Sequence, residues 1–290
     1  MRVLISPNLE KPGSAACTRA VITKLTGLGL TPLLGYADAQ ALGLSGQGVG
    51  CVMGAFDSLL PGCDIIMAIG GDGTLLRAAQ SSLSGKKPLL GINTGRIGFL
   101  TQIEADELDK LDALRDGGYT ILRRMLLEII LVQDGKRERF VALNDAVLSR
   151  GQSERMVEIA VTCGETSVSS HRADGLIFST PTGSTAYSLA AGGPVVDPEL
   201  SLILLTAVCP HSYFHRTMIL SPGQTYRACE VAGNNKIGLD LSVDGLRAGV
   251  LRVDGHILVG AAKEQAYFIE LGRRDFYHRV DVKLRLDRKY

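Results

Sequence analysis

An apolar segment that runs straight into a glycine-rich loop limits what this chain can fold into more than any other feature. Residues 64–69, Asp-Ile-Ile-Met-Ala-Ile, are followed by Gly-Gly-Asp-Gly-Thr at 70–74 and then by apolar residues at helical spacing from about Leu75 to Leu83. A continuous apolar run bounded by glycine is typical of a parallel strand that is covered on both faces. The segment therefore predicts a strand, a tight turn and a helix, in that order.

The same alternation extends over the first third of the chain. Short apolar runs are separated by segments whose apolar residues fall on one helical face. Such alternation implies an α/β fold with a parallel sheet. We expect strands at 3–5, 31–34 and 88–92 and helices at 14–29 and 106–114, and we assign no element to the Gly- and Ala-rich stretch 35–61.

After about residue 120 the pattern changes to that of antiparallel strands. Leu126–Val132 and Phe140–Leu148 flank the dipeptide Asp134-Gly135, which is a typical hairpin turn. Apolar and polar residues alternate at 157–161 and again at 237–243. Many short strands joined by glycine turns predict a mostly antiparallel, β-sandwich-like domain.

The chain length also favours two domains, because 290 residues is about twice the usual domain size. We predict an α/β nucleotide-binding domain at 1–120 and a β-rich domain at 121–271. From Arg273 onward, Phe276, Val280 and Leu284 recur at helical spacing. We expect this last segment, 272–290, to pack back on the first domain.

Composition excludes several classes of protein. The 31 Lys and Arg against 30 Asp and Glu leave a net charge of +1, which argues against binding to nucleic acid or an anionic membrane by bulk electrostatics. No apolar run of about 20 residues occurs, so we expect no membrane span. The closest cysteines, Cys51 and Cys63, are twelve residues apart. That spacing excludes a CxxC motif and predicts a cytoplasmic protein with reduced thiols.

The glycine-rich loop is suited to binding phosphate. Gly70, Gly71 and Gly73 let the backbone approach a ligand closely, and the free N–H groups at the start of the following helix suit an anion. Asp72 beside a phosphate is unfavourable unless a metal or a substrate hydroxyl lies between them. The alternative is a tight turn in which Asp72 caps the helix. Walker A and GxGxxG motifs are absent, so any nucleotide would be bound by a loop of another kind.

A second segment, 174–194, combines an apolar strand with a turn of hydroxyl and glycine residues and a small-residue helix. Ser and Thr offer both donors and acceptors, and Tyr187 offers a flat face. The segment is therefore suited to a ribose, an amide or a base. The alternative is a helix that Thr182 or Ser184 caps.

Two shorter features carry polar groups. Asn144 and Asp145 interrupt an apolar strand, and an adjacent amide and carboxylate can hold vicinal ribose hydroxyls. The alternative is a strand end or bulge that faces solvent. His171 and Arg172 precede Asp174 and either place a cation on a phosphate or form a surface pair. No HExxH or GxSxG pattern is present, which argues against a zinc enzyme and a serine hydrolase.

Taken together and in this order, the motifs resemble those of the NAD kinase family. GGDGT alone is shared with lipid kinases and, in related form, with phosphofructokinases, whereas TPTGSTAYS is far more specific. The motifs that carry the resemblance are GGDGT at 70–74, NTGRIGFL at 93–100, Asn144-Asp145, RADGL at 172–176, TPTGSTAYSLAAGGP at 180–194 and SVDG at 242–245.

The resemblance implies transfer of the γ-phosphoryl group of ATP to the adenosine 2′-hydroxyl of NAD, giving NADP. It also implies Mg²⁺ or another divalent cation, with no protein ligand assigned to it, and a homodimer or homotetramer. Asp72 would be the general base and would contact NAD. By the same resemblance, the phosphate-binding residues would be Gly70, Gly71, Gly73, Thr74 and Arg172. The NAD-binding residues would be Asp72, Gly73, Phe99, Asn144, Asp145, Asp174, Thr182, Ser184, Thr185, Ala186, Tyr187 and Ser188.

Three positions depart from the family pattern or vary within it. Asp145 stands where the family usually has Glu, which is one methylene longer. Ala173 stands where the family has Gly, and Arg96 lies at a variable position to which we assign no role. Two alternatives stay open: a lipid kinase that uses the same GGDGT loop, which the polar segment 180–188 disfavours, and a non-catalytic NAD-binding sensor.

Overall fold

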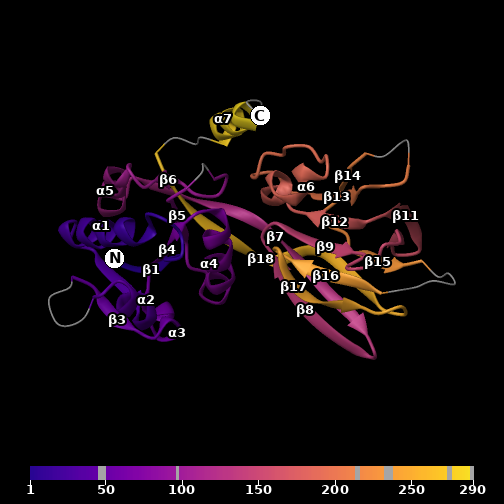
Figure 1. The fold of residues 1–290 in the computed structure, drawn as a ribbon, viewed down its shortest axis with the longest axis horizontal. Helices are drawn as coiled ribbons and strands as arrows, with labels where there is room; N and C mark the ends of the chain where they lie inside the picture. Colours follow the sequence, from indigo (N-terminus) through magenta and orange to yellow (C-terminus); the bar gives the residue numbers. More distant parts are fainter. Residues whose placement is uncertain (45–49, 96–97, 213–215, 232–237, 273–275, 288–290) are drawn as a thin grey trace. The chain divides into compact units, whose positions relative to one another are not determined.

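The computed structural model describes residues 1–44, 50–95, 98–212, 216–231, 238–272 and 276–287 (Figure 1). Arg96, the variable family position, lies outside these residues. The chain forms two compact units, which we call unit 1 (Met1–Arg123 and Ala266–Tyr290) and unit 2 (Arg124–Gln265). No helix in the described ranges has both the length and the apolar character needed to cross a membrane.

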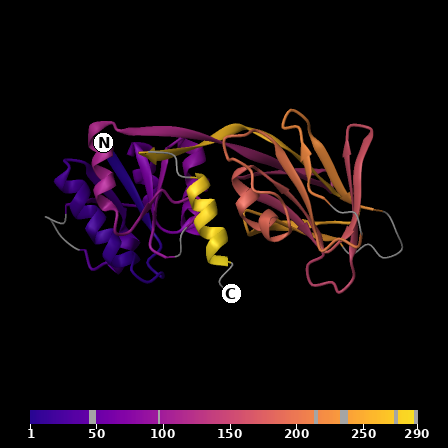
Figure 2. The same ribbon diagram turned by 90° about the horizontal axis from the view of Figure 1, so that it is seen from above.

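Two long strands, β7 (Tyr119–Gln133) and β18 (His256–Leu271), carry the chain from one unit into the other (Figure 2). The units divide at 123/124 and 265/266, whereas the sequence pattern placed the divisions at 120/121 and 271/272. The difference arises because each division falls inside an unbroken strand. No turn residue marks the point at which packing changes from one unit to the other.

Unit 1 contains a parallel sheet with the strand order β5-β4-β1-β2-β3. The central strand β1 pairs with β4 through Val3 and Ile65 and with β2 through Leu4 and Leu33. These pairings confirm the predicted parallel sheet. The strands are β1 (Arg2–Pro7), β2 (Thr31–Gly35), β3 (Val52–Gly54), β4 (Ile65–Gly70) and β5 (Leu89–Asn93), with β6 (Ile103–Glu104) beside β5.

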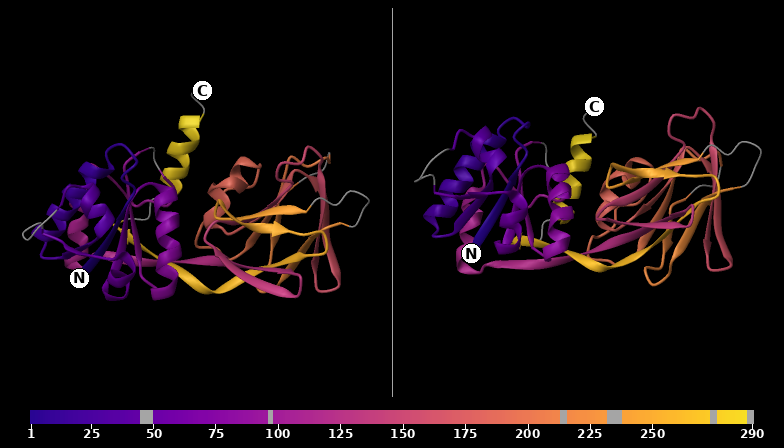
Figure 3. Two further views of the ribbon diagram at one scale, coloured as in Figure 1. Left: turned by 60° about the horizontal axis from the view of Figure 1, so that its bottom comes forward. Right: turned by 90° about the horizontal axis from the view of Figure 1, so that it is seen from below.

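Helices lie on both sides of this sheet (Figure 3). On one face, Val21 and Leu25 of α1 pack with Val3 and Ile5 in one apolar cluster. On the other face, α4 lies so close to β5 that a Cβ at Gly91 would be 2.8 Å from the Leu75 side chain. The helices are α1 (Ser14–Gly27), α2 (Tyr36–Ala41), α3 (Phe56–Leu59), α4 (Asp72–Gly85), α5 (Asp112–Asp116) and α7 (Phe276–Asp287), with 3₁₀ turns η1 (Leu60–Gly62) and η2 (Leu108–Leu111).

The predicted helix at 106–114 is wrong in detail, because it is divided between η2 and α5. The backbone at Glu107 has φ −104° and ψ 25°, which is outside the helical range, so the helix begins later. The C-terminal helix α7 is part of unit 1. There the Arg279 guanidinium donates to the carbonyl oxygens of Thr101 and, at 3.1 Å, Gln102.

Unit 2 consists of antiparallel strands, which confirms the predicted β-sandwich-like class. One sheet has the order β14-β13-β12-β9-β16-β17, and the other contains β11-β10-β15-β18 with β7 and β8. Apolar residues of both sheets, such as Phe178 and Ile159, form one buried cluster. The strands new to this unit are β8 (Lys136–Ala142), β9 (Asp145–Ser149), β10 (Val157–Cys163), β11 (Thr166–Ala173), β12 (Gly175–Ser179), β13 (Ile203–Val208), β14 (Met218–Leu220), β15 (Tyr226–Glu230), β16 (Leu239–Val243) and β17 (Leu246–Leu251).

The predicted hairpin is confirmed, because β7 and β8 pair from Leu127–Ala142 to Gln133–Lys136. Asp134 and Gly135 have φ of 52° and 70°, as a type I′ turn requires. The single strand predicted at 140–148 is wrong. The chain breaks between β8 and β9, and β9 pairs with β12 and β16 in the other sheet. Polar contacts hold the backbone at this break and are described below.

Candidate active site

The glycine-rich loop joins the end of β4 to the start of α4. Gly70 and Gly71 have φ of 155° and 157°, a conformation open essentially to glycine. Space is also restricted, because a Cβ at Gly70 would lie 2.5 Å from Thr74 Oγ1 and one at Gly71 would lie 2.7 Å from Lys11 Nζ. The Lys11 ammonium donates to the Gly70 carbonyl at 3.3 Å. A cation that the motif analysis missed therefore lies at this loop.

The loop also occupies the position at which α/β sheets usually bind ligands. In the order β5-β4-β1-β2-β3, the chain progresses in opposite directions from β1 and from β4, so a topological switch point lies between them. Ligands of such sheets bind beyond the carboxyl ends of the strands at this point. Gly70 ends β4, and Asn8 follows β1 and donates its N–H to Ile69 O at 2.8 Å. The strand order thus supports the loop as a ligand site.

Asp72 is the first residue of α4, and Gly71 occupies the capping position without a side-chain cap. The alternative interpretation of Asp72 as the helix cap is therefore wrong. Its carboxylate instead accepts three backbone N–H groups: Oδ2 accepts from Phe99 at 2.8 Å, and Oδ1 accepts from Leu100 at 3.0 Å and Thr101 at 3.3 Å. Each carboxylate oxygen has two lone pairs, so Oδ2 retains capacity for a further hydrogen bond.

In unit 2, a buried carboxylate organises the break between β8 and β9. Asp244, in the turn between β16 and β17, accepts the N–H groups of Leu143 at 2.9 Å, Asn144 at 2.7 Å and Asp145 at 3.2 Å. Its own N–H donates to Asp145 O at 2.9 Å. The SVDG string contains this residue, but no role was assigned to it. The sequence offered only the motif as a signal, because about 100 residues separate the partners.

Asn144 and Asp145 lie at the start of β9, yet the alternative of a solvent-facing strand end is wrong. Asp145 is only 5% exposed. Its burial, together with the charge of Asp244, raises the pKa of its carboxyl to about 7. Within the described residues, the buried Asn144 Oδ1 has no hydrogen-bond partner. A buried acceptor of this kind calls for a donor from a ligand or water.

The burial of Asp145 predicts that stability falls as pH rises. The folded pKa of about 7 lies above the ordinary value of 3.8, so the folded protein holds a proton that the unfolded chain has released. The free energy of unfolding should decline by a few kcal/mol between those pKa values and then level off. Urea unfolding measured across this range tests the prediction. The decline should disappear in Asp145→Asn and persist in Asp240→Asn, whereas an equal decline in all three proteins would contradict it.

The segment after β12 packs directly against this break. Thr180 Oγ1 donates to Leu143 O at 2.6 Å and accepts the Gly183 N–H at 3.0 Å. Gly183 lies so close to the break that an added Cβ would collide with the Asn144 carbonyl oxygen. The two motifs, distant in sequence, therefore form one packed structure within unit 2.

A collision of this kind has a measurable consequence. Gly183→Ala should lower the free energy of unfolding by about 1–3 kcal/mol, because the backbone at Asn144 must move to admit the methyl group. Gly27→Ala is the matched control, since Gly27 lies at the exposed end of α1 with no atom within 4 Å of its added Cβ. Thermal or urea unfolding compares the two variants. Equal stability would contradict the packing described here.

The predicted small-residue helix is instead two short pieces, η3 (Thr182–Thr185) and α6 (Tyr187–Ala190). They are separated by Ala186, whose ψ of −128° is not helical. Neither Thr182 nor Ser184 caps a helix, so that alternative is wrong. The hydroxyl groups bond elsewhere: Ser184 Oγ accepts from Val196 N at 3.0 Å, and Thr185 Oγ1 donates to Thr182 O at 3.2 Å. Such local bonds compete with a regular helix.

The predicted NAD-binding residues of this segment differ in exposure. Thr182, Ser184 and Ser188 are buried, and the Ser188 hydroxyl bonds Thr206 Oγ1 at 3.0 Å. Thr185 and Ala186 are half-buried, and Tyr187 is exposed. The buried hydroxyls therefore hold the segment in its shape. Thr185, Ala186 and Tyr187 are the residues that solvent can reach.

Asp174 and Arg172 lie at the junction of β11 and β12. Asp174 Oδ1 accepts from Arg150 Nε at 2.7 Å, with both side chains about one third exposed. Arg150, which follows β9, was missed because it is distant from Asp174 in sequence. Arg172 is exposed, and its carbonyl oxygen accepts the His211 N–H at 2.8 Å.

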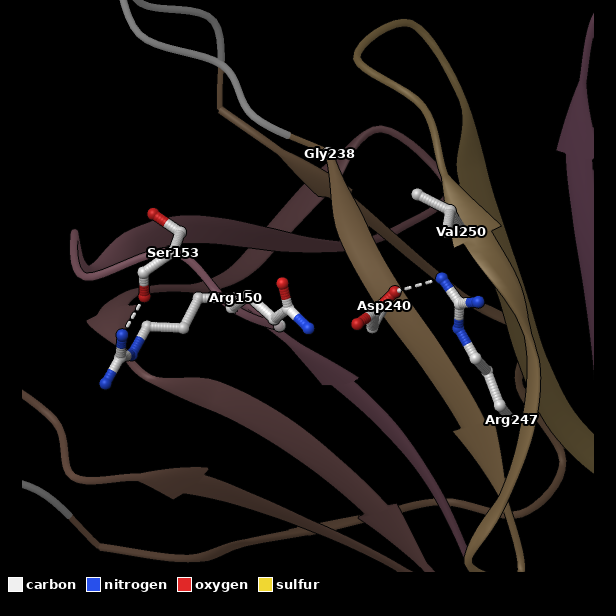
Figure 4. Close-up of a pocket in the computed structure, with 8 residues that line it drawn as sticks. Arg150, Ser153, Gly238, Asp240, Arg247 and Val250 are labelled. Carbon is white, nitrogen blue, oxygen red and sulfur yellow. Dashed lines mark hydrogen bonds and ion pairs between the residues drawn. The ribbon is translucent and has the colours of Figure 1, made fainter.

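Arg150 also lines a cavity of about 630 Å³ in unit 2 (Figure 4). There it donates to the Ser153 carbonyl oxygen, and Arg247 pairs with Asp240 at 3.0 Å. Both arginines are thus paired with carboxylates, Asp174 and Asp240. These carboxylates already compensate the positive charge of the two arginines, so we assign no ligand to this cavity.

Two family models match the chain: the ATP-NAD kinase N-terminal domain over residues 55–119 and the ATP-NAD kinase C-terminal domain over 143–271. The chain belongs to the NAD kinase family. It is therefore an enzyme of the phosphotransferase class, and this disfavours the alternative of a non-catalytic NAD-binding sensor.

Full-length relatives agree with this assignment. The NAD kinase of Desulforamulus reducens is 38% identical over 280 residues, covering 96% of this chain and 95% of its own. The NAD kinase of Symbiobacterium thermophilum is 39% identical over 281 residues, with 96% of both chains covered. This chain thus spans nearly the whole length of established NAD kinases.

Solved structures show the same architecture. The crystal structure of yeast NADH kinase complexed with NADH superposes with a TM-score of 0.86 at 26% identity, over 97% of this chain and 86% of that one. An Archaeoglobus fulgidus NAD kinase in complex with ATP superposes with a TM-score of 0.72 at 24% identity, over 97% and 99%. The second likeness shows the fold alone.

Proposed function

We propose that this NAD kinase transfers the γ-phosphoryl group of ATP to the adenosine 2′-hydroxyl of NAD and produces NADP. The observation that carries the proposal is the Asp72 carboxylate, held by three N–H groups at the phosphate-binding loop of a chain in this family. The family description names both ATP and NAD. The oligomeric state implied by the resemblance stays a prediction.

Unit 1 supplies the groups suited to the phosphates of ATP. The extended Gly70-Gly71 backbone and the start of α4 at Asp72 present N–H groups, which suit anionic oxygens. The Lys11 ammonium adds a positive charge at the same loop. We assign the phosphate-binding role to Gly70, Gly71, Gly73 and Thr74, with Arg172 as a further cation from unit 2.

The residues present fit a divalent cation that arrives with the nucleotide. Among the described residues, no group of three or more His, Cys, Asp or Glu side chains could hold a metal ion. Mg²⁺ usually keeps several waters and is bound by substrate phosphates with one or two carboxylates. Asp72 is the carboxylate at the phosphate loop that would contribute to holding it. When bound, the cation would offset the charge of the triphosphate.

Asp72 is proposed to align the acceptor hydroxyl and receive its proton at Oδ2. Phosphoryl transfer has a loose transition state, so positioning matters more than the strength of the base. The bonds from Phe99, Leu100 and Thr101 fix the carboxylate plane before substrate arrives. The oxygen–phosphorus bond then forms at the 2′-oxygen as the bond to the leaving ADP breaks.

Unit 2 supplies the groups proposed to hold NAD. Asn144 brings a buried acceptor without a partner among the described residues, and Asp145 lies next to it. We assign ribose hydroxyls to this pair, the nicotinamide amide to Asp174 and the exposed aromatic face to Tyr187. In unit 1, Phe99 is proposed to border the adenine. In unit 2, the remaining predicted residues, Thr182, Ser184, Thr185, Ala186 and Ser188, are proposed to contact NAD or to shape the segment that does.

A coupled assay tests the proposal directly. Purified protein, ATP, Mg²⁺ and NAD are mixed, and NADP is detected with an NADP-specific dehydrogenase. We expect NADP to form and its formation to stop on addition of EDTA. A folded protein that makes no NADP with ATP or with polyphosphate would overturn the proposal. NAD binding without turnover would then favour a sensor, and phosphorylation of a lipid instead of NAD would favour a lipid kinase.

A further inference from the structure

A cavity of about 540 Å³ opens beside the phosphate loop within unit 1. This size falls in the range of roughly 300–1,000 Å³ that is typical of small-molecule sites. Its walls come from the end of β1 and the segment after it, from α2 and α3, and from α4. It therefore borders the switch point of the parallel sheet, where nucleotides bind in other folds of this topology.

Thr74 gives an independent indication of a ligand. The residue lines this cavity and is only 4% exposed. Its Oγ1 has no hydrogen-bond partner among the residues that the structure describes. Most buried hydroxyl groups have a partner, so this atom calls for one from outside the chain. Thr74 also belongs to the phosphate loop, which connects the cavity to the proposed phosphate site.

The remaining walls suit a nucleoside base. Ala41, Phe56 and Ala78 offer apolar surface, as a flat aromatic ring requires. Asp38, in the first turn of α2, places a carboxylate among them. Burial raises the pKa of the Asp38 carboxyl, and an amino group that donates to the carboxylate would offset this loss of hydration. Glu10 and Arg77 also line the cavity, at the segment after β1 and on α4. The cavity thus combines apolar walls with charged groups, and Asp38 is the carboxylate that α2 places among the apolar walls.

We propose that this cavity binds the adenosine of the phosphoryl donor, with Asp38 accepting a hydrogen bond from the exocyclic amino group of adenine. Thr74 Oγ1 binds the donor where it meets the phosphate loop. The inference rests on the proposed function, since it names the base that the donor site selects. A carboxylate only accepts hydrogen bonds, so the site discriminates against bases that carry a carbonyl at the same position.

Binding can be tested without turnover. The probe is adenosine 5′-(β,γ-imido)triphosphate with Mg²⁺ in a calorimeter, without NAD. Ala41 is exposed at the end of α2, so Ala41→Trp fills the cavity without disturbing the core. We expect this variant to bind the probe at least tenfold more weakly than the wild type. Ala20→Trp, at an exposed position on α1 that does not line the cavity, should bind it normally.

Base selection is tested by comparing ATP with inosine triphosphate, which carries a carbonyl in place of the amino group. Asp38→Asn should reduce the preference for ATP about tenfold, because the amide both donates and accepts. Asp57→Asn on the neighbouring helix α3 is the control. The KM for NAD should not change in either variant.

The outcomes separate this inference from the proposed function. Equal binding of the probe by Ala41→Trp and the wild type overturns the cavity assignment, even if NADP forms. An unchanged preference for ATP in Asp38→Asn overturns the role of that carboxylate. If Ala41→Trp weakens binding of the probe but the wild type makes no NADP, the cavity assignment is supported and the proposed function is overturned.

Discussion

Asp72→Asn should lower kcat by about 10²–10⁴-fold, the range usually lost with a general base. The amide has nearly the same shape, and its oxygen can still accept the N–H groups of Leu100 and Thr101. Its NH₂ group, however, cannot accept the proton of the 2′-hydroxyl. It also faces the Phe99 N–H, which now donates to Oδ2 at 2.8 Å. Steady-state kinetics in the coupled assay measure the loss.

Two controls keep this experiment interpretable. Thermal unfolding and the Kd for NAD report whether the variant is folded and binds substrate. Asp112→Asn changes the first turn of another helix in the same unit, where the carboxylate pairs with Lys24 at 3.0 Å, and should leave kcat unaltered. Activity like that of the wild type in folded Asp72→Asn would overturn the general-base assignment.

Asp244→Asn should raise the KM for NAD about 10- to 100-fold, which corresponds to ~1.4–2.8 kcal/mol. The Asp244 carboxylate accepts the N–H groups of Leu143, Asn144 and Asp145, and an amide cannot replace both of its oxygens as acceptors. Asn tolerates the positive φ of 50° at this position, so the turn itself should persist. The KM for ATP should remain unchanged, because the proposed donor groups lie almost entirely in unit 1.

The pH dependence of binding separates this role from simple loss of stability. In the wild type, the KM for NAD should change with an apparent pKa near that of Asp145, about 7. Removing the charge of Asp244 lowers the pKa of Asp145, so the transition should move to lower pH in Asp244→Asn. It should vanish in Asp145→Asn. Asp240→Asn, on the same strand β16, should retain the wild-type profile, and an identical profile in Asp244→Asn would contradict the coupling.

Local patterns in the sequence predicted the fold class well. The apolar run before the glycine loop is β4, and the Asp134-Gly135 dipeptide forms the type I′ turn of the β7–β8 hairpin. These features depend on the residues within one segment. The periodicity of the apolar side chains determines whether a strand or a helix forms, and glycine determines where the chain turns. The Gly- and Ala-rich stretch 35–61 has no such periodicity. Its elements α2, β3 and α3 form because they pack on β2 and on one another.

The candidate site depends more on the tertiary structure. Sequence motifs named Asp72, Asn144 and the segment 180–188, and the resemblance gave each of them a role. Those motifs are short and chemically distinctive, and their order along the chain was enough to identify them. What surrounds each residue was not predictable, because the decisive partners are distant in sequence.

The sequence by itself therefore determined the fold class, the glycine-rich turn between β4 and α4, and the family. The tertiary structure decided which groups are buried, which are held by hydrogen bonds and which are left without partners among the described residues. Asp145 acquires its raised pKa only because folding buries it beside Asp244, and Lys11 reaches Gly70 only because β1 and β4 are neighbours. Burial and electrostatic interaction depend on distance in space, and spacing along the chain does not record that distance.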